Sequence, residues 1–399
     1  MPEFSKRMSD MAATAKVVEK LFKAMGDPET ISFGGGAMAK EALPVEQLRE
    51  IADDVMRRDK RGIEMLQYGP PEGIKDLREV ISSYLLKPKG VNAEADDIMV
   101  VSGGLETMNL LCQVFIDPGD VILVESPTFV HCVEIFEMFQ AKCIAMEGDE
   151  QGIVIDALER QIQQLHPKFI YVIPTFQNPS GRTLPLERRI KLAELGSKYD
   201  VIILEDDPYR DLRYSGEEIP PIKCFDKTGN TVLANSFSKI FSPGSRVGYV
   251  CASKEILAKL YNAKTATNSQ TSSLVQVLCA EYFKRGYFDE QLKKICAIHK
   301  ERRDVMMQCI DEFFPAGTKK NFPDGGLFTW VELSGEIDTT ELLEKAGEYK
   351  VAFIAGEKFF VEGNGKGKNC MRLSFGNTTP ENIRIGMERL GRLIKDSYK

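Results

Sequence analysis

The sequence predicts an α/β fold in which a mostly parallel sheet lies between helices, followed by a smaller α+β unit. Short apolar runs alternate with helical stretches from about residue 97 onward. These runs are apolar on both faces, which is typical of parallel strands covered by helices on both sides. Beyond residue 320 the composition shifts toward a second, smaller set of strands and helices.

The elements of the larger unit follow each other in regular order. Strands are predicted at 98–101, 121–124, 169–173, 201–204, 232–234 and 248–251, and helices at 105–115, 129–139, 155–165 and 185–199. Ligands of such sheets bind beyond the carboxyl ends of the strands. Polar motifs directly follow several of these strands, so we expect them to share one edge of the sheet.

The flanking segments are predicted to be largely helical. A polar N-terminal arm carries a short amphipathic piece at 17–25, and a helix opened by Pro44 extends over 44–58. Residues 273–315 are mostly helical, with a long helix at 288–314 that could bridge two domains. The C-terminal unit has strands at 321–333 (after a loop), 351–355 and 371–375, and helices at 340–349 and 380–397.

Bulk properties exclude several classes of function. The net charge of −7 argues against a general role at nucleic acids or membrane surfaces. No apolar run approaches transmembrane length, and the N-terminus lacks the apolar core of a signal peptide. The nine cysteines form no C-x-x-C pair, which indicates reduced thiols in a cytoplasmic protein. Three widely separated histidines match no metal spacing, so we expect no metal.

The strongest chemical signal lies in residues 235–248. Lys239 directly follows a predicted buried strand and is flanked by Ser236, Ser238 and Arg246. Burial and nearby cations lower the pKa of a lysine from its usual ~10.4, and the free amine can form a Schiff base with a carbonyl. Hydroxyls and an arginine suit a phosphate. A carbonyl on a phosphorylated ring is pyridoxal 5'-phosphate (PLP).

This stretch alone permits other interpretations. Ser236-x-x-Lys239 also fits the serine–lysine signature of β-lactamases, with Lys227-Thr-Gly as its third motif. The order of those motifs is reversed here, and no Ser-Asp-Asn occurs. A lysine that simply extends from the surface beside a turn is the remaining alternative.

Other candidate residues follow the remaining strands. Ser102-Gly-Gly opens a helix whose N-terminal amides suit a phosphate. Phe129 either stacks on a heterocycle or begins a core helix. Asn178 precedes a proline and can donate a hydrogen bond. The acids at 205–207 fit a metal or the ring nitrogen of PLP, and the absence of a complementary ligand cluster favours the second.

Three further features lie outside this series. Arg372, within an apolar strand, needs either a structural carboxylate or that of a substrate. The glycines at 34–36 fit either a phosphate cradle or a tight backbone passage, and the second is the commoner, because Ala39 leaves the G-x-G-x-x-G fingerprint incomplete. Tyr68 lies in a loop, where functional residues are common, although a lone tyrosine is more often a packing residue.

In order and spacing these motifs resemble the class I and II aminotransferases of PLP fold type I. The resemblance covers nearly the whole chain and is closest to the branch of aminoadipate, kynurenine and aromatic aminotransferases. It rests on Tyr68-Gly-Pro-x-Glu-Gly, Ser102-Gly-Gly, Pro127-x-Phe129, Asn178-Pro-Ser-Gly, Asp206-Asp-Pro-Tyr209, Ser236-x-Ser-Lys239 with Arg246, and Arg372-x-Ser-Phe. It implies a seven-stranded sheet, a large PLP-binding domain at 46–285 and a small domain at 286–399. Residues 1–45 would supply an arm and part of the small domain.

The resemblance also implies a role for each residue in cofactor binding and catalysis. Lys239 would form the Schiff base and move the proton, and Asp206 would pair with the pyridine nitrogen. Asn178 and Tyr209 would bind the phenolic oxygen, and Phe129 would stack on the ring. The phosphate would be held by Gly103, Gly104, Leu105, Ser236, Ser238 and Arg246.

Substrate binding would involve Arg372 at the α-carboxylate, with Asn178, Gly35 and Tyr68 beside it. Tyr68 would also bind cofactor, by reaching the phosphate of the neighbouring subunit, so the resemblance implies a homodimer. The implied reaction is ping-pong transfer from an L-amino acid to a 2-oxo acid, with 2-oxoglutarate as acceptor. The alternatives are a PLP-dependent lyase, decarboxylase or synthase, and a regulatory binding module. The acidic charge and the lack of room ahead of the fold for a DNA-binding domain argue against the module.

Three departures from the family pattern concern a phosphate contact, the ring that stacks on the cofactor and the loop that borders the substrate pocket in relatives. Gly104 stands where relatives often carry a hydroxyl residue, and Phe129 replaces a more usual tyrosine or tryptophan. Gly35-Gly36 is followed by Ala-Met-Ala-Lys in place of a proline-bearing loop. The preferred amino donor is therefore not assigned from the sequence.

Overall fold

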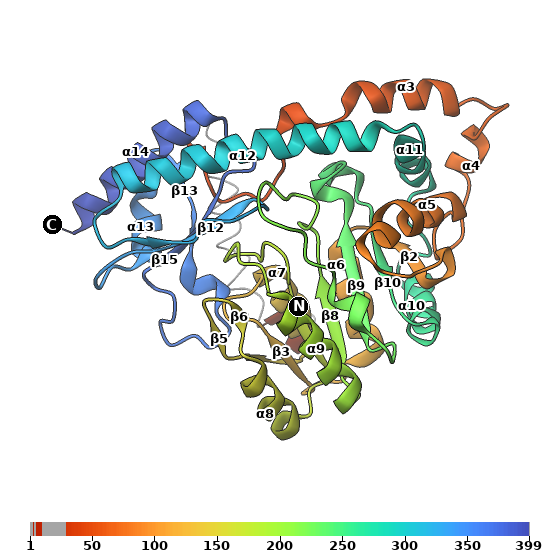
Figure 1. Cartoon of the computed structure of the whole chain (residues 1–399), viewed down its shortest axis with the longest axis horizontal. Coiled ribbons are helices and arrows are strands. Elements are labelled where there is room, and N and C mark those ends of the chain that lie inside the picture. The colour runs from red at the N-terminus through yellow and green to blue at the C-terminus, as the bar shows by residue number, and fades with distance from the viewer. Residues whose placement is uncertain (1–2, 4, 10–28, 399) are drawn as a thin grey trace.

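A computed structural model describes residues 3, 5–9 and 29–398 of the chain (Figure 1). The amphipathic piece expected at 17–25 lies outside the described residues. The short helix α1 (Lys6–Ser9) precedes that gap.

The large sheet has seven strands in the order β2-β10-β9-β8-β7-β3-β4. Only β10 runs antiparallel to its two neighbours, β2 and β9. The expected mostly parallel, seven-stranded sheet is therefore confirmed. The strands are β2 (Ile98–Val101), β3 (Val121–Val124), β4 (Lys142–Ala145), β7 (Phe169–Val172), β8 (Ile202–Asp206), β9 (Thr231–Ser236) and β10 (Gly248–Cys251).

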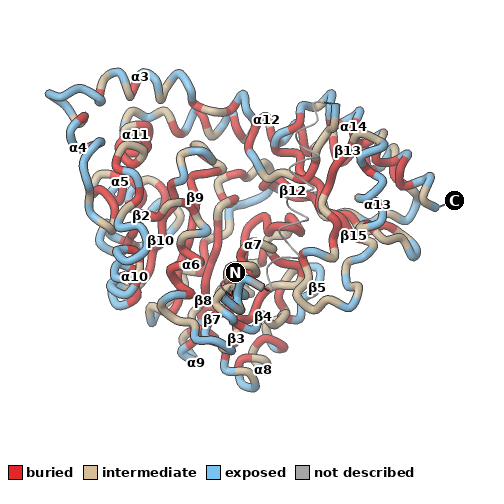
Figure 2. Tube along the Cα trace, turned by 180° about the vertical axis from the view of Figure 1, so that it is seen from behind, coloured by how far each residue is buried: buried red, intermediate tan, exposed pale blue. Residues whose placement is uncertain are grey.

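Alternate residues of the central strands face two different hydrophobic clusters. Phe169 and Tyr171 of β7 belong to the cluster that contains residues of α6, α7 and α11, whereas Ile170 and Val172 belong to the cluster with residues of α8 and α9. Both faces of the strands are therefore apolar. In Figure 2 the central strands are red, the colour of buried residues, along most of their length. The covering helices are α6 (Gly104–Phe115), α7 (Val130–Met138), α8 (Ile155–Leu165), α9 (Leu186–Tyr199), α10 (Lys254–Thr267) and α11 (Ser273–Lys284).

The N-terminal helices lie outside this layer. They are α3 (Val45–Val55), α4 (Gly62–Leu66) and α5 (Lys75–Val80), and α5 continues as a wider turn over Ile81–Leu86. Helix α3 ends three residues before the predicted end at 58. The chain leaves it through an exposed turn that leads into α4.

The C-terminal unit contains a four-stranded sheet in the order β11-β12-β15-β14. Its elements are β11 (Lys319–Lys320), β12 (Phe328–Glu332), α13 (Thr339–Ala346), β14 (Ile354–Ala355), β15 (Cys370–Ser374) and α14 (Pro380–Ser397). The single strand predicted at 351–355 is wrong, because the run divides between two sheets. Its first half, β13 (Val351–Ala352), pairs in parallel with β1 (Ile31–Ser32) from the N-terminal region, and its second half pairs with β15.

Helix α12 (Tyr287–Phe313) connects the two cores and runs across the top of Figure 1. Phe288 and Ile295 at its beginning belong to the large core, whereas Met306 and Ile310 belong to the core of the C-terminal unit. The long helix predicted at 288–314 is therefore confirmed. Among the described residues, no helix has the length and apolar character needed to cross a membrane.

Candidate functional site

Lys239 ends the short helical turn η6 (Phe237–Lys239), directly after β9. Its Nζ donates a hydrogen bond to the carbonyl oxygen of Gly36 at 2.7 Å. Burial, followed by the cations Arg372 and Arg246, lowers the pKa of this amine to about 8, while Asp206 opposes the change. An ammonium group in this position gives up its proton far more readily than one in water.

Asp206 is the last residue of β8, the strand next to β9, and it is almost completely buried. Its Oδ2 accepts a hydrogen bond from the Tyr171 hydroxyl at 2.8 Å. Burial raises the pKa of the carboxyl to about 7, and Asp207 adds to this, while Tyr171 and Lys239 act in the opposite direction. Asp206 and Lys239 therefore lie close enough for each to influence the charge of the other.

Tyr209 and Asn178 lie in the same site as Lys239 and Arg372. The Lys239 Nζ is 6.0 Å from the centroid of the buried Tyr209 ring. Burial raises the pKa of the Tyr209 hydroxyl well above its usual value, and Arg372 and a hydrogen bond with Asn178 oppose that rise. Asn178 also accepts a hydrogen bond at Oδ1 from Arg372 Nη1 at 2.8 Å. One amide therefore links the tyrosine to the arginine.

Arg372 extends from β15 of the C-terminal unit, and its guanidinium lies over two aromatic rings. Its Cζ is 4.3 Å from the ring centroid of Phe328 and 5.2 Å from that of Phe359. Nη2 donates to the carbonyl oxygen of Gly34, whereas the buried Nε has no hydrogen-bond partner in the part of the chain that the structure describes. Burial lowers the pKa of Arg372 to about 10. Tyr209 opposes this change, and no carboxylate of the described residues contributes to it.

The N-terminus of α6 meets Arg246 and the serines that follow β9. Gly103 precedes the helix with φ +88°, a conformation that favours glycine. Arg246 Nη2 donates to the carbonyl oxygen of Ser102 at 3.3 Å, and a Cβ on Gly103 would lie 2.2 Å from that nitrogen. Ser236 Oγ donates to Ser238 Oγ at 2.9 Å. The free amides of a helix end, two hydroxyls and a guanidinium together form a set of donors suited to phosphate.

The remaining predicted residues are less buried or have fewer contacts with the residues described above. Gly35 lies between the two carbonyl groups that accept hydrogen bonds from Arg372 and Lys239. Phe129 is half-buried directly before α7. Leu105 is partly exposed in the first turn of α6, and Tyr68 is 88% exposed on the loop before α5.

The sequence analysis missed three side chains of this site: Tyr171, Phe328 and Phe359. Tyr171 lies in a strand predicted only as an apolar run, yet its hydroxyl needs a partner once it is buried, and that need was a usable signal. Phe328 and Phe359 had no comparable signal, because the contact with Arg372 brings together segments far apart in the sequence.

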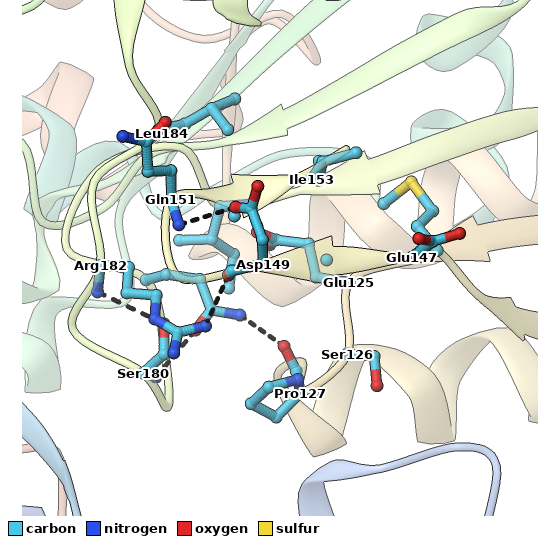
Figure 3. A pocket seen from close by; sticks show the side chains of 15 residues that line it. Glu125, Ser126, Pro127, Glu147, Asp149, Gln151, Ile153, Ser180, Arg182 and Leu184 are labelled. Carbon is cyan, nitrogen blue, oxygen red and sulfur yellow. Dashed lines mark hydrogen bonds between the residues drawn. The ribbon is translucent and has the colours of Figure 1, made fainter. Parts of the chain in front are cut away.

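A separate, small pocket lies beside the hairpin of β5 (Gly148–Asp149) and β6 (Gly152–Ile153), as Figure 3 shows. Glu125, Asp149 and Arg182 line it, whereas Lys239 and Asp206 do not. Glu125 accepts a hydrogen bond from the amide of Ile173 at 2.8 Å, and burial raises its pKa to about 8. These contacts support the loop that carries Asn178. No group of three or more His, Cys, Asp or Glu in the described part of the chain could hold a metal.

Comparison with known proteins gives a consistent result. The family model of class I and II aminotransferases matches residues 28–390. Aromatic-amino-acid aminotransferase 1 of Thermococcus litoralis is 38% identical over 100% of this chain and 96% of its own length.

Two solved structures have the same fold over nearly their whole length. Kynurenine aminotransferase of Pyrococcus horikoshii is 36% identical, with a TM-score of 0.93 over 99% of this chain and 98% of its own. Alpha-aminoadipate aminotransferase of Thermus thermophilus, solved with N-(5'-phosphopyridoxyl)-L-leucine, is 30% identical, with a TM-score of 0.89 over 98% of this chain and 97% of its own. The chain belongs to the class I and II aminotransferase family and is a transaminase with the type I fold of PLP-dependent enzymes.

Proposed function

We propose that this transaminase binds PLP at Lys239 and transfers the amino group of an L-amino acid to 2-oxoglutarate by ping-pong chemistry. The observation that carries the proposal is the grouping of the half-buried Lys239 with the buried Asp206 and Arg372, each with a pKa displaced toward neutral pH. Such displaced groups concentrate at functional sites. The Thermus relative, solved with a phosphopyridoxyl amino acid, supports the same cofactor.

The residues present fit PLP in charge and in hydrogen-bonding capacity. The α6 N-terminus, Ser236, Ser238 and Arg246 would hold the phosphate, because they supply donors and a fixed positive charge. Asp206 would face the ring nitrogen, since a buried carboxylate needs a cationic partner. Tyr209 and Asn178 would bind the phenolic oxygen, and Phe129 would lie against the ring.

The substrate carboxylate would bind Arg372. The structure offers this guanidinium no carboxylate among the described residues, and its Nε lacks a partner. A carboxylate of the amino acid would satisfy both the charge and the free donor. The two aromatic rings and the carbonyl of Gly34 keep the guanidinium in one orientation, so the bound Cα is held in a fixed place.

Proton transfer is the task of Lys239. When bound, PLP supplies an aldehyde for Schiff-base formation and an electron-withdrawing ring for charge that develops at Cα. The Lys239 amine, neutral in a large fraction of molecules near pH 8, accepts the proton from the substrate Cα. The resulting Lys239 ammonium would hold that proton and could release it again as transfer is completed. The Asp206 carboxylate would favour a protonated ring nitrogen, because its negative charge disfavours loss of that proton.

The proposal extends to assembly and location. Tyr68 is 88% exposed in the single chain. It would complete the site of a second copy, so the active form is a homodimer. We place it in the cytoplasm, in amino-acid metabolism, because its cysteines carry no sign of an oxidising compartment.

The purified protein is tested with PLP and with amino donors. Wild type should be yellow, and Lys239→Ala should lose the absorbance band of the Schiff base between this lysine and PLP. A colourless wild type in the presence of PLP would contradict the proposal. Incubation with a donor and 2-oxoglutarate should accumulate glutamate, whereas ammonia without glutamate would indicate a lyase. The donor panel should include aromatic amino acids, kynurenine and 2-aminoadipate, which the names of the relatives suggest.

A further inference from the structure

Tyr171 is a fully buried side chain in the middle of the large sheet, and its hydroxyl reaches the Asp206 carboxylate. It lies in β7, next to β8, where its register partner is Leu204. Its hydroxyl donates to Asp206 Oδ2 at 2.8 Å. In the part of the chain that the structure describes, Tyr171 is the side chain that donates a hydrogen bond to this carboxylate.

The environment of Asp206 makes this hydrogen bond important. Burial and the neighbouring Asp207 both favour the neutral carboxylic acid, whereas a ring nitrogen needs the charged carboxylate as its partner. Tyr171 and Lys239 are the groups that favour the charged form. Lys239 is the residue that reacts with the cofactor, so its positive charge is not a constant part of the site. Tyr171 is constant.

The surroundings of Tyr171 hold its hydroxyl in place. The ring packs edge-on against Phe136 of α7, with centroids 5.4 Å apart, and Cys132 of the same helix lies beside the hydroxyl. Burial raises the pKa of the Tyr171 hydroxyl well above its usual value. The hydroxyl therefore remains a donor over the whole range in which an enzyme works.

We propose that Tyr171 is a positioning residue of the transamination site, whose hydroxyl holds Asp206 charged and aimed at the ring nitrogen of PLP. This inference rests on the proposed function, because it requires PLP to bind opposite Asp206. Tyr171 itself touches neither the cofactor nor the substrate. Its effect passes through the carboxylate.

A double-mutant cycle on cofactor affinity tests the inference. The dissociation constant of PLP is measured by titrating the cofactor-free forms of wild type, Tyr171→Phe, Asp206→Ala and the double variant. Tyr171→Phe keeps the ring and removes one hydrogen bond to a charged group, so it should weaken PLP binding about tenfold or more. In the Asp206→Ala background the same substitution should change affinity less than about twofold, since the partner is gone.

A packing control and a cofactor analogue complete the design. Phe136→Leu disturbs the contact with the Tyr171 ring but keeps the hydroxyl, so its affinity loss should be smaller than that of Tyr171→Phe, with melting temperatures measured for both. A PLP analogue with carbon in place of the ring nitrogen should bind wild type and Tyr171→Phe equally well. A preserved difference with that analogue would overturn the inference, as would an equal loss in the Asp206→Ala background.

Failure of the proposed function gives a different result. If wild type does not bind PLP at all, the proposed function fails whatever Tyr171 does. If wild type binds PLP and Tyr171→Phe binds it equally well, the positioning role fails and the proposed function stands.

Discussion

The groups around the Lys239 amine have opposite effects on its pKa. Burial, Arg372 and Arg246 favour the neutral amine, and Asp206 favours the ammonium. The balance sets the pKa at about 8, well below the usual ~10.4. The lysine is therefore prepared to react before any cofactor arrives.

This prepared state can be measured on the cofactor-free protein. Only the neutral amine reacts with formaldehyde and a reducing agent, so labelling of Lys239 should rise with pH through about 8 and level off above it. Exposed lysines of the same chain should keep rising toward pH ~10.4. Mass spectrometry of the peptides gives both curves from one sample.

The matched variant is Arg372→Met. It removes the cation that has the largest lowering effect after burial, so the Lys239 curve should move to higher pH. A Lys239 curve that coincides with those of the surface lysines would show that burial and cations do not act on this amine.

Arg372 also makes a prediction about substrate binding. Arg372→Ala should weaken amino-acid binding by about 2–5 kcal/mol, because it removes a buried charge that we propose pairs with the substrate carboxylate. The value of KM for the amino donor measures the loss. Arg384→Ala, which removes an exposed ion pair with Glu312, should leave KM unchanged. An unaltered KM for Arg372→Ala would exclude the contact.

Among the elements, the turn into α6 combines two constraints on one residue. Gly103 has φ +88°, and a Cβ would lie 2.2 Å from Arg246 Nη2. Gly103→Ala should therefore displace Arg246 from the N-terminus of α6, and PLP affinity should fall at least about tenfold. Binding of pyridoxal, which lacks the phosphate, should change much less.

Gly119→Ala is the matched control. Gly119 has φ +95°, but a Cβ there would meet nothing within 4 Å. It shares the backbone strain without the collision, so it should lower thermal stability and leave PLP affinity unchanged. Equal losses of affinity in the two variants would mean that strain alone explains the effect.

At the scale of elements, the sequence predicted the strands that an apolar run marks and missed a strand whose character depends on its position at the edge of the sheet. The apolar runs and the motifs after them gave six strands of the large sheet and the place of Lys239 and Asp206. Strand β4 was missed because it pairs with β3 alone, at the edge, and its residues are only partly buried. An edge strand need not be apolar on both faces, so no apolar run marks it.

At the scale of the whole molecule, the prediction concerns the sharing of Tyr68. If Tyr68 serves the neighbouring site, Tyr68→Ala and Lys239→Ala damage different sites of a mixed dimer. One site of that dimer then has both an intact lysine and an intact tyrosine from the other chain. Co-refolding two weakly active variants in equal amounts should restore about a quarter of the wild-type activity, because half of the dimers are mixed.

The control is a mixture of Asp206→Ala and Lys239→Ala. Both residues belong to the same chain's site, so each mixed dimer has two damaged sites and no activity should return. The absence of restoration with Tyr68→Ala would mean that Tyr68 serves its own chain.

Long-range pairing is the part of the fold that local pattern cannot predict. Residues 351–355 read as one strand, but Val351 and Ala352 pair with Ile31 and Ser32, while Ile354 and Ala355 pair with β15. The choice depends on a partner some 320 positions away, and nothing in the run itself encodes it. The rings around Arg372 are unpredictable for the same reason.

The pairing of β1 with β13 also bears on how the enzyme is made on the ribosome. Gly34 and Gly36, which accept hydrogen bonds from Arg372 and Lys239, follow directly on β1. Their docking strand is translated only after residue 352, and Arg372 later still. A nascent chain that carries Lys239 but has not yet received its last segments lacks the parts that orient the amine and the substrate. Under the proposed function, Lys239 and Arg372 therefore reach the arrangement of the folded chain only after residue 372 has been translated.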